Sequence, residues 1–220
     1  MSEKLELVFD PNTIEHLGIS LYSKLPSVLS ELISNSWDAD AKEIEVDFID
    51  DSTKKEIHFT DTGHGMNFDE LQNNYLVIGR NRRKTTGKQE SPGGRKVIGK
   101  KGLGKLSVFG ICNIIEVVSI KDNVRNHFKM DLAQIRNSKG SYEPEVLQKN
   151  ESTTDNNGTK LLLKEIRRKS AFDLDKIALS LSKKFLIFDE MKTSLFLNSS
   201  SKTDLTNLNI IIRLFDLGLQ

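Results

Sequence analysis

An apolar stripe at helical spacing marks the longest regular element that the sequence predicts, a helix over residues 26–38. Val28, Leu29, Leu32 and Ile33 fall on one face of that helix, as in helices that pack against a core. Elsewhere the apolar residues come in shorter runs between polar turns, and this pattern favours strands.

The same patterns predict the other elements. Further helices are predicted at 13–21, at 67–78, beginning near Leu103, and at 174–185. Strands are predicted at 43–49, 56–60, 114–120, 125–132, 159–163 and 193–197. Strands joined by polar turns, with helices gathered before and after them, predict an α+β fold in which a mixed sheet carries its helices on one face.

Composition narrows the class of protein. The chain has 220 residues, enough for one sizeable domain, and its formal net charge of +1 creates no global field for nucleic acid or a membrane. The first residues lack the apolar core of a signal peptide, and no apolar run approaches the length of a membrane span. Cys112 is the only cysteine, which excludes an internal disulfide, and its apolar surroundings predict a buried, unreactive thiol. These features predict a cytoplasmic protein that does not engage a membrane.

A polar face accompanies the apolar stripe of the helix predicted at 26–38. Glu31, Asn35 and Asp38 stand at i, i+4 and i+7, so they lie on one side of it. Carboxylate and carboxamide oxygens in this arrangement suit a site for magnesium and a nucleotide. For this helix taken alone, the alternative is an ordinary solvated stripe.

A glycine-containing turn, Asp61-Thr-Gly-His-Gly-Met66, follows the strand predicted at 56–60. The carboxylate of Asp61 can accept a hydrogen bond from the exocyclic amine of adenine. Gly63 and Gly65 leave room for the base to lie against the main chain. On its own the signal is weak, because Asp-Thr-Gly turns are common.

Two further blocks carry glycine before an apolar stretch. Gly99-Lys-Lys-Gly-Leu-Gly-Lys-Leu-Ser107 offers backbone amides that can hold phosphate oxygens. It nearly matches the P-loop pattern G-x-x-x-x-G-K, but Leu106 stands where that motif needs a Ser or Thr hydroxyl for magnesium. The last block, Gly158-Thr-Lys-Leu-Leu-Leu163, places Thr159 at the start of a hydrophobic strand.

In this order, the four blocks resemble the GHKL superfamily of ATPases, which includes gyrase-type topoisomerases, ninety-kilodalton heat-shock chaperones, histidine kinases, and MutL and MORC proteins. The resemblance covers about residues 12–165 and is greatest to MORC-like and bacterial GHKL proteins. It implies a Bergerat-type ATP-binding fold, a two-layer sandwich of a mixed, mainly antiparallel sheet with helices on one face. It also implies ATP and Mg²⁺ as cofactors.

Carried over by position, the resemblance assigns Glu31 as the general base that activates the attacking water and Asn35 as the magnesium ligand. It places the nucleotide against the end of the helix (Asp38, Ala39, Lys42), the adenine-binding turn (Asp61, Gly63, Gly65, Met66), and the phosphate-binding end of the lid (Gly99, Gly102, Leu103, Gly104, Lys105). Thr159 matches a hydroxyl near the base.

The loop 80–105 carries ten basic residues and one acidic residue, a local charge of +9. It coincides with the ATP lid of the family, residues 80–104 here, and its composition is that of a mobile segment. Three roles compete for these charges: pairing with the triphosphate, docking of nucleic acid, and a solvated loop. Triphosphate pairing is favoured for Lys101 and Lys105, beside the glycines, and the absence of aromatic residues counts against nucleic acid.

The function predicted is Mg-dependent ATP binding and slow hydrolysis by an N-terminal ATPase module, residues 1–200, that drives lid closure and nucleotide-dependent homodimerisation in a larger protein. Residues 201–220 are expected to form a linker or the start of a following domain. DNA or a client protein is the expected further partner. Two alternatives stay open: a histidine-kinase-type phosphotransfer domain, which does not need a water-activating Glu31, and a nucleotide-gated interaction module acting on DNA.

Overall fold

A computed structural model describes residues 4–8, 24–77, 90–98, 107–138, 140–183, 191–198 and 210–212. Its main strands are β2 (Glu43–Asp50), β3 (Lys55–Asp61), β4 (Cys112–Lys121), β5 (Val124–Asp131), β7 (Glu145–Ser152), β8 (Gly158–Ile166), β9 (Lys192–Asn198) and β10 (Ile210–Ile212). Two short strands, β1 (Leu7–Val8) and β6 (Ser141–Tyr142), pair separately. The helices are α2 (Leu25–Asp38), α3 (Phe68–Glu70), α6 (Leu132–Asn137) and α7 (Leu174–Ser182), with a π-helical turn η2 (Leu71–Tyr75) and a 3₁₀ turn η3 (Val108–Gly110).

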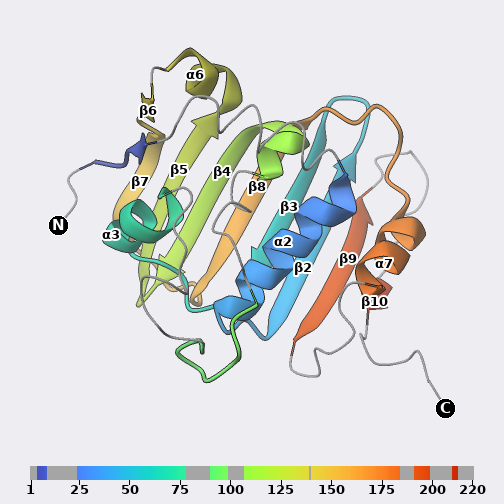
Figure 1. Ribbon diagram of the computed structural model, residues 1–220, viewed down its shortest axis with the longest axis horizontal. Coiled ribbons are helices and arrows are strands. Elements are labelled where there is room, and N and C mark those ends of the chain that lie inside the picture. Colours follow the sequence, from blue (N-terminus) through green and yellow to red (C-terminus); the bar gives the residue numbers. More distant parts are fainter. Residues whose placement is uncertain are drawn as a thin grey trace.

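The eight main strands form one sheet in the order β10-β9-β2-β3-β8-β4-β5-β7. Only β2 and β9 run parallel within it, and the other described neighbours are antiparallel. Helices α2, α3 and α7 lie on one face of this sheet (Figure 1). The predicted α+β class, with a mixed sheet and helices on one face, is therefore confirmed.

Burial along the strands shows why only one face carries helices. In β2, Ile44, Val46 and Phe48 are buried, whereas the alternating residues Glu43 and Glu45 are exposed. A strand with this alternation can bury one side only. The apolar side is the one that the helices cover.

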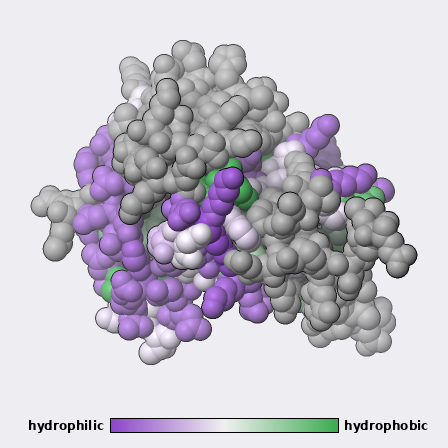
Figure 2. Space-filling view, turned by 60° about the horizontal axis from the view of Figure 1, so that its bottom comes forward, coloured by the Kyte–Doolittle hydropathy of each residue, from purple (hydrophilic) through white to green (hydrophobic). Residues whose placement is uncertain are grey.

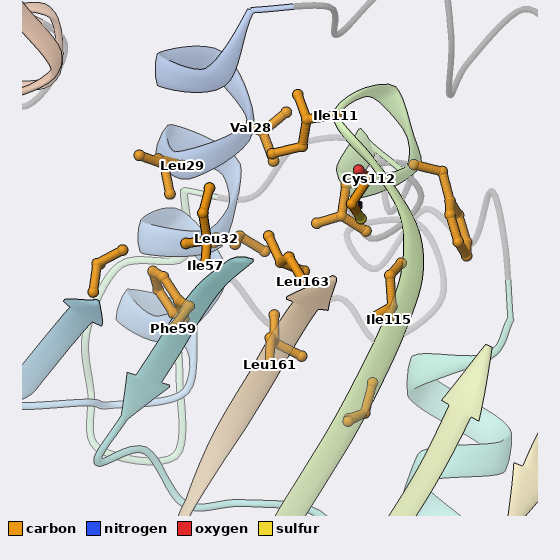
Figure 3. Close-up of a cluster of buried hydrophobic side chains, with 14 of the residues drawn as sticks. Val28, Leu29, Leu32, Ile57, Phe59, Ile111, Cys112, Ile115, Leu161 and Leu163 are labelled. Atoms are coloured by element: carbon orange, nitrogen blue, oxygen red, sulfur yellow. Dashed lines mark hydrogen bonds between the residues drawn. The ribbon is translucent and has the colours of Figure 1, made fainter. Parts of the chain in front are cut away.

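The core lies between α2 and the middle of the sheet. Val28, Leu29 and Leu32 of α2 belong to one cluster of buried side chains with Phe59 of β3 and Leu163 of β8 (Figure 3). Full burial of one such side chain contributes about 1.5–3 kcal/mol. This packing holds the polar face of α2 in a defined place relative to the strands.

The single cysteine belongs to the same core (Figure 3). Cys112 is buried, its Sγ donates to the carbonyl of Val108 at 3.2 Å, and burial raises the pKa of its thiol to about 12. The predicted burial of the thiol is confirmed, and the raised pKa disfavours the thiolate, which is the reactive form.

Helix α2 ends in a Schellman motif. The amide of Ala41 donates to the carbonyl of Ser36, and the amide of Asp40 donates to the carbonyl of Trp37, each at 3.0 Å. Asp40 adopts the left-handed conformation with φ of 60°, which Asp tolerates better than most residues. The chain therefore reverses directly after the predicted nucleotide face and enters β2.

Several predicted elements differ from the structure. The helix predicted at 67–78 is divided into α3 and the π-helical η2, which ends at Tyr75. Strand β4 begins at Cys112, two residues before the predicted start. The predicted strand 125–132 ends at Asp131, because α6 begins at Leu132. The helix predicted at 13–21 lies outside the described residues, as do residues 99–106, where the helix near Leu103 was expected to begin.

Among the elements that were not predicted, β7 and α6 have a clear physical reason. The edge strand β7 has no buried residue, so its sequence lacks the alternation that marks a half-buried strand. Helix α6 has only six residues and depends on a cap: Oδ1 of Asp131 accepts from the amides of Ala133 and Gln134. Strand β10, within the segment 201–220, pairs with β9. None of the helices in the described ranges is both long and apolar enough to cross a membrane.

Candidate nucleotide site

The buried carboxylate of Asp61 is the centre of the candidate site. Asp61 is the last residue of β3 and is 8% exposed. Its Oδ2 accepts from Oγ of Ser36 and its Oδ1 from the amide of Gly63, both at 2.9 Å. Burial raises the pKa of this carboxyl, and hydrogen bonds from Gly63, Ser36 and Thr159 oppose the rise. A ligand that donated another hydrogen bond would stabilise the ionised form.

The two glycines of the turn are required by close packing. A Cβ on Gly63 would lie 2.9 Å from Cβ of Ala39, and one on Gly65 would lie 1.9 Å from the carbonyl oxygen of Ile120. Gly65 also has φ of +64°, a conformation that favours glycine. The turn therefore lies tightly between the end of α2 and strand β4.

Gly158 completes this packing from β8. A Cβ there would lie 2.2 Å from the carbonyl oxygen of Asp61. The next residue, Thr159, is paired directly with Asp61 across β3 and β8. The structure thus brings the predicted hydroxyl beside the predicted adenine acceptor.

The end of α2 and the turn are also joined through the backbone. The amide of His64 donates to the carbonyl of Ala39 at 3.0 Å, and Oγ1 of Thr62 accepts from the amide of Lys42 at 3.1 Å. The side chain of Lys42 is exposed, whereas Met66 is partly buried and packs against the core. The end of α2, with Asp38, Ala39 and Lys42, therefore lies directly against the turn from Asp61 to Met66.

The polar face of α2 is not uniformly solvated. Glu31 and Asn35 are half-buried, and their side chains make no hydrogen bond to any other described residue. Asp38 is 6% exposed, and its Oδ1 accepts from the amide of Ile98 at 2.9 Å. Asp38, at a position predicted to line the nucleotide, therefore also holds the backbone of Ile98.

The segment 90–98 is bound to the same end of α2. Nε1 of Trp37 donates to the carbonyl of Lys96 at 3.0 Å, and the guanidinium of Arg95 lies 4.5 Å from the centre of the Trp37 ring. Arg95 also donates to the carbonyl of Ala41 at 2.6 Å. Trp37 is partly buried against the core and holds this segment in addition.

Asp40 binds the other half of this segment. Its carboxylate accepts from Oγ of Ser91 and from the amide of Gly93, the latter at 2.8 Å. Sequence reasoning missed Asp40, and also Ser36 and Ser119 of the turn's surroundings. The available signal was an acidic residue just past the end of a helix, where the helix dipole disfavours it.

The phosphate-binding residues predicted from the glycine block lie outside the described residues: Gly99, Lys101, Gly102, Leu103, Gly104 and Lys105. Of the predicted lid, 80–104, residues 80–89 and 99–104 lie outside the described residues. Figure 2 brings the lower edge of Figure 1 forward, and the described part of that face is mainly hydrophilic with small hydrophobic patches.

Comparison of the sequence with known proteins shows the family to which this chain belongs. The family model described as "Histidine kinase-, DNA gyrase B-, and HSP90-like ATPase" matches residues 22–160. This range holds α2, the turn and Thr159, so the chain belongs to that family. The resemblance to GHKL ATPases is confirmed, and membership supports ATP binding as the general property of the domain.

Two curated relatives share this region. The chain is 37% identical over 166 residues to the putative type II restriction enzyme HgiDII of Herpetosiphon aurantiacus, covering 74% of this chain and 26% of the relative. It is 31% identical over 145 residues to the chaperone protein HtpG of Treponema denticola, covering 57% of this chain and 22% of the relative. The chain thus matches about a quarter of the length of each.

Proposed function

We propose that this chain binds ATP together with Mg²⁺ and hydrolyses the nucleotide slowly, as the ATPase module of a larger protein. The observation that carries the proposal is the buried carboxylate of Asp61, 8% exposed and held by Ser36 and Gly63, in a chain of this ATPase family. Burying an ionised carboxylate costs free energy unless hydrogen-bond donors, such as those of a bound ligand, compensate for the lost water.

Adenine is the base that fits this carboxylate. An ionised carboxyl can only accept hydrogen bonds, so it needs a donor on the base. Adenine offers its exocyclic amine, whereas guanine carries an oxygen at the same position. We infer that Asp61 selects ATP over GTP, with Thr159 as the neighbouring hydroxyl.

Glu31 and Asn35 suit the chemistry at the phosphates. They lie one helical turn apart on α2 and are half-buried. Glu31 is proposed as the base that takes the proton of the attacking water. The carboxamide oxygen of Asn35 is the kind of hard ligand that Mg²⁺ prefers, so the residues present fit the ion. Bound Mg²⁺ would neutralise charge on the phosphoryl oxygens. Lys101 and Lys105 are proposed to pair with the triphosphate.

The larger protein is proposed to use this module for lid closure and nucleotide-dependent dimerisation. The chain covers only 26% and 22% of its two relatives. The molecule on which the ATP cycle acts is therefore proposed to be bound by other parts of such a protein. Identity of 37% to a putative restriction enzyme favours DNA as that partner over a client protein. Phosphotransfer to histidine has less support, because it makes no use of Glu31.

Calorimetric titration of ATP tests the proposal. Asp61→Asn should weaken ATP binding at least about 10-fold, because a hydrogen bond to a charged group is lost. Asp131→Asn is the matched control, since asparagine also caps helices and Asp131 caps α6 away from the site. Equal ATP affinity in the wild type and in Asp61→Asn would remove Asp61 from the site. No ATP binding by the wild type would overturn the proposed function itself.

A further inference from the structure

One row of side chains across the sheet is polar where the neighbouring row is apolar. Strand pairing aligns Phe59, Leu161, Val117 and Phe128 across β3, β8, β4 and β5, and all four are buried. Two residues further along the same strands, pairing aligns Asp61, Thr159, Ser119 and Asn126. Paired residues share a face, so both rows lie on the helix-covered side of the sheet.

Two residues of the polar row are buried as deeply as the apolar row, whereas Thr159 is only partly buried. Ser119 is 0% exposed and Asn126 is 1% exposed. Nδ2 of Asn126 has no hydrogen-bond partner among the described residues. Burying such groups costs free energy, so core packing alone does not explain why this row is polar.

Ser119 has a specific partner in the adenine-binding turn. Its Oγ accepts from the amide of Met66 at 2.8 Å. The start of the turn is held by hydrogen bonds at Asp61 and His64, but its end meets the sheet at Ser119. Gly65, the residue before Met66, lies against the carbonyl of Ile120, which follows Ser119 in β4.

We propose that Ser119 is a positioning residue for the adenine subsite. By fixing the end of the turn to β4, its hydroxyl sets the distance between the Gly63–Gly65 backbone, on which the base lies, and the Asp61 carboxylate, which accepts from its amine. The inference rests on the proposed binding of adenine at Asp61. It predicts that Ser119 controls base selectivity without touching the base.

The test compares the affinities for ATP and ITP, because hypoxanthine carries an oxygen in place of the exocyclic amine. In the wild type, ATP should bind about 10- to 100-fold more tightly than ITP. Ser119→Ala should weaken ATP binding about 10-fold and ITP binding less than about 3-fold, so that the ratio collapses. Ser119→Thr, which keeps an acceptor oxygen, should retain the wild-type ratio.

Thr193→Val is the matched control. Thr193 is a buried residue of β9, in register with Ile44, and its Oγ1 has no partner among the described residues. Removing its hydroxyl should leave the ATP to ITP ratio unchanged. If Ser119→Ala does not fold, Ser119→Cys provides the comparison, because it has a similar volume and a weaker acceptor, and a reduced ratio is again expected.

Four results would overturn the inference. Equal losses of ATP and ITP affinity in Ser119→Ala would show a merely structural role, and so would unchanged affinities for both. A wild type that binds ATP but does not distinguish it from ITP would also overturn it, leaving ATP binding intact. A wild type that binds neither nucleotide would overturn the proposed function and this inference together.

Discussion

The amide of Ile98 donates a hydrogen bond of 2.9 Å to Oδ1 of Asp38, so the last turn of α2 holds a segment sixty residues away in the chain. Asp40 does the same for the amide of Gly93 at 2.8 Å. Acidic residues at a helix C-terminus are disfavoured by the helix dipole, and these backbone donors offset that cost. The segment 90–98 therefore has a defined place next to the proposed nucleotide.

Hydrogen exchange can distinguish the contact of Asp38 with Ile98 from the contact of Asp40 with Gly93. Asp38→Ala should accelerate exchange of the Ile98 amide about 10-fold or more, and Asp40→Ala should do so for the Gly93 amide, because each loses a charge-assisted hydrogen bond. Amide exchange followed by NMR measures both. The two variants serve as controls for one another, and equal acceleration of both amides in either variant would contradict separate anchors.

Glu31 and Asn35 should differ in what they affect. Glu31→Ala is expected to leave ATP affinity within a few-fold and to reduce hydrolysis by about 10²-fold or more, the usual scale for a general base. Asn35→Ala should instead weaken Mg-ATP binding. Calorimetry beside a turnover assay separates the two effects, with Glu45→Ala, an exposed position of β2, as the control. Parallel loss of binding and turnover in Glu31→Ala would make Glu31 a binding or structural residue.

Adenosine affinity should depend on the pKa of Asp61. Because burial raises this pKa, protonation removes the charged acceptor at a higher pH than for an ordinary Asp, whose pKa is about 3.9. Affinity should therefore fall on acidification, with a midpoint above about pH 3.9. Adenosine is the suitable ligand because it has no phosphate to titrate. A midpoint at or below the ordinary value would contradict the raised pKa.

The contribution of Asp61 to protein stability should depend on pH in the opposite direction and fall as the pH rises. A carboxyl whose pKa is raised by folding contributes stability that is fully present below its unfolded pKa and is lost as the pH rises through its folded pKa. Asp61→Asn should remove this loss, so the variant should gain stability relative to the wild type between pH 4 and neutrality. Urea unfolding across about pH 4–7 measures the difference. A constant difference in the free energy of unfolding would show that Asp61 has the same pKa in both states.

Gly65→Ala should be strongly destabilising. The left-handed backbone costs about 1–2 kcal/mol for alanine, and a Cβ at 1.9 Å from the Ile120 oxygen adds an overpacking cost of about 1–3 kcal/mol. Gly94→Ala is the matched control, since Gly94 also has a positive φ, of +84°, but nothing lies within 4 Å of its Cβ position. Chemical unfolding of both variants gives the comparison. Equal destabilisation would show that the turn can move away from β4.

Local patterns were sufficient for much of the fold. The apolar stripe predicted α2 to within a residue, and alternation predicted β2 and β3 with similar accuracy, because each of these elements buries one face along its whole length. Edge strand β7 buries neither face, so no periodicity marked it. The break of the 67–78 helix into α3 and η2 also left no local signal.

The sequence by itself determined the family, because four short motifs follow one another in a fixed order. It also determined the polar face of α2 and the glycines of the turn, because these depend on spacing within a single element or loop. Only the tertiary structure decided that Ser119 supports Met66 and that Asp38 binds Ile98. These pairs are separated by 53 and 60 residues, and strand register and helix packing bring them together. Register is a property of the whole sheet, set by the burial of every strand at once, so no local pattern contains it.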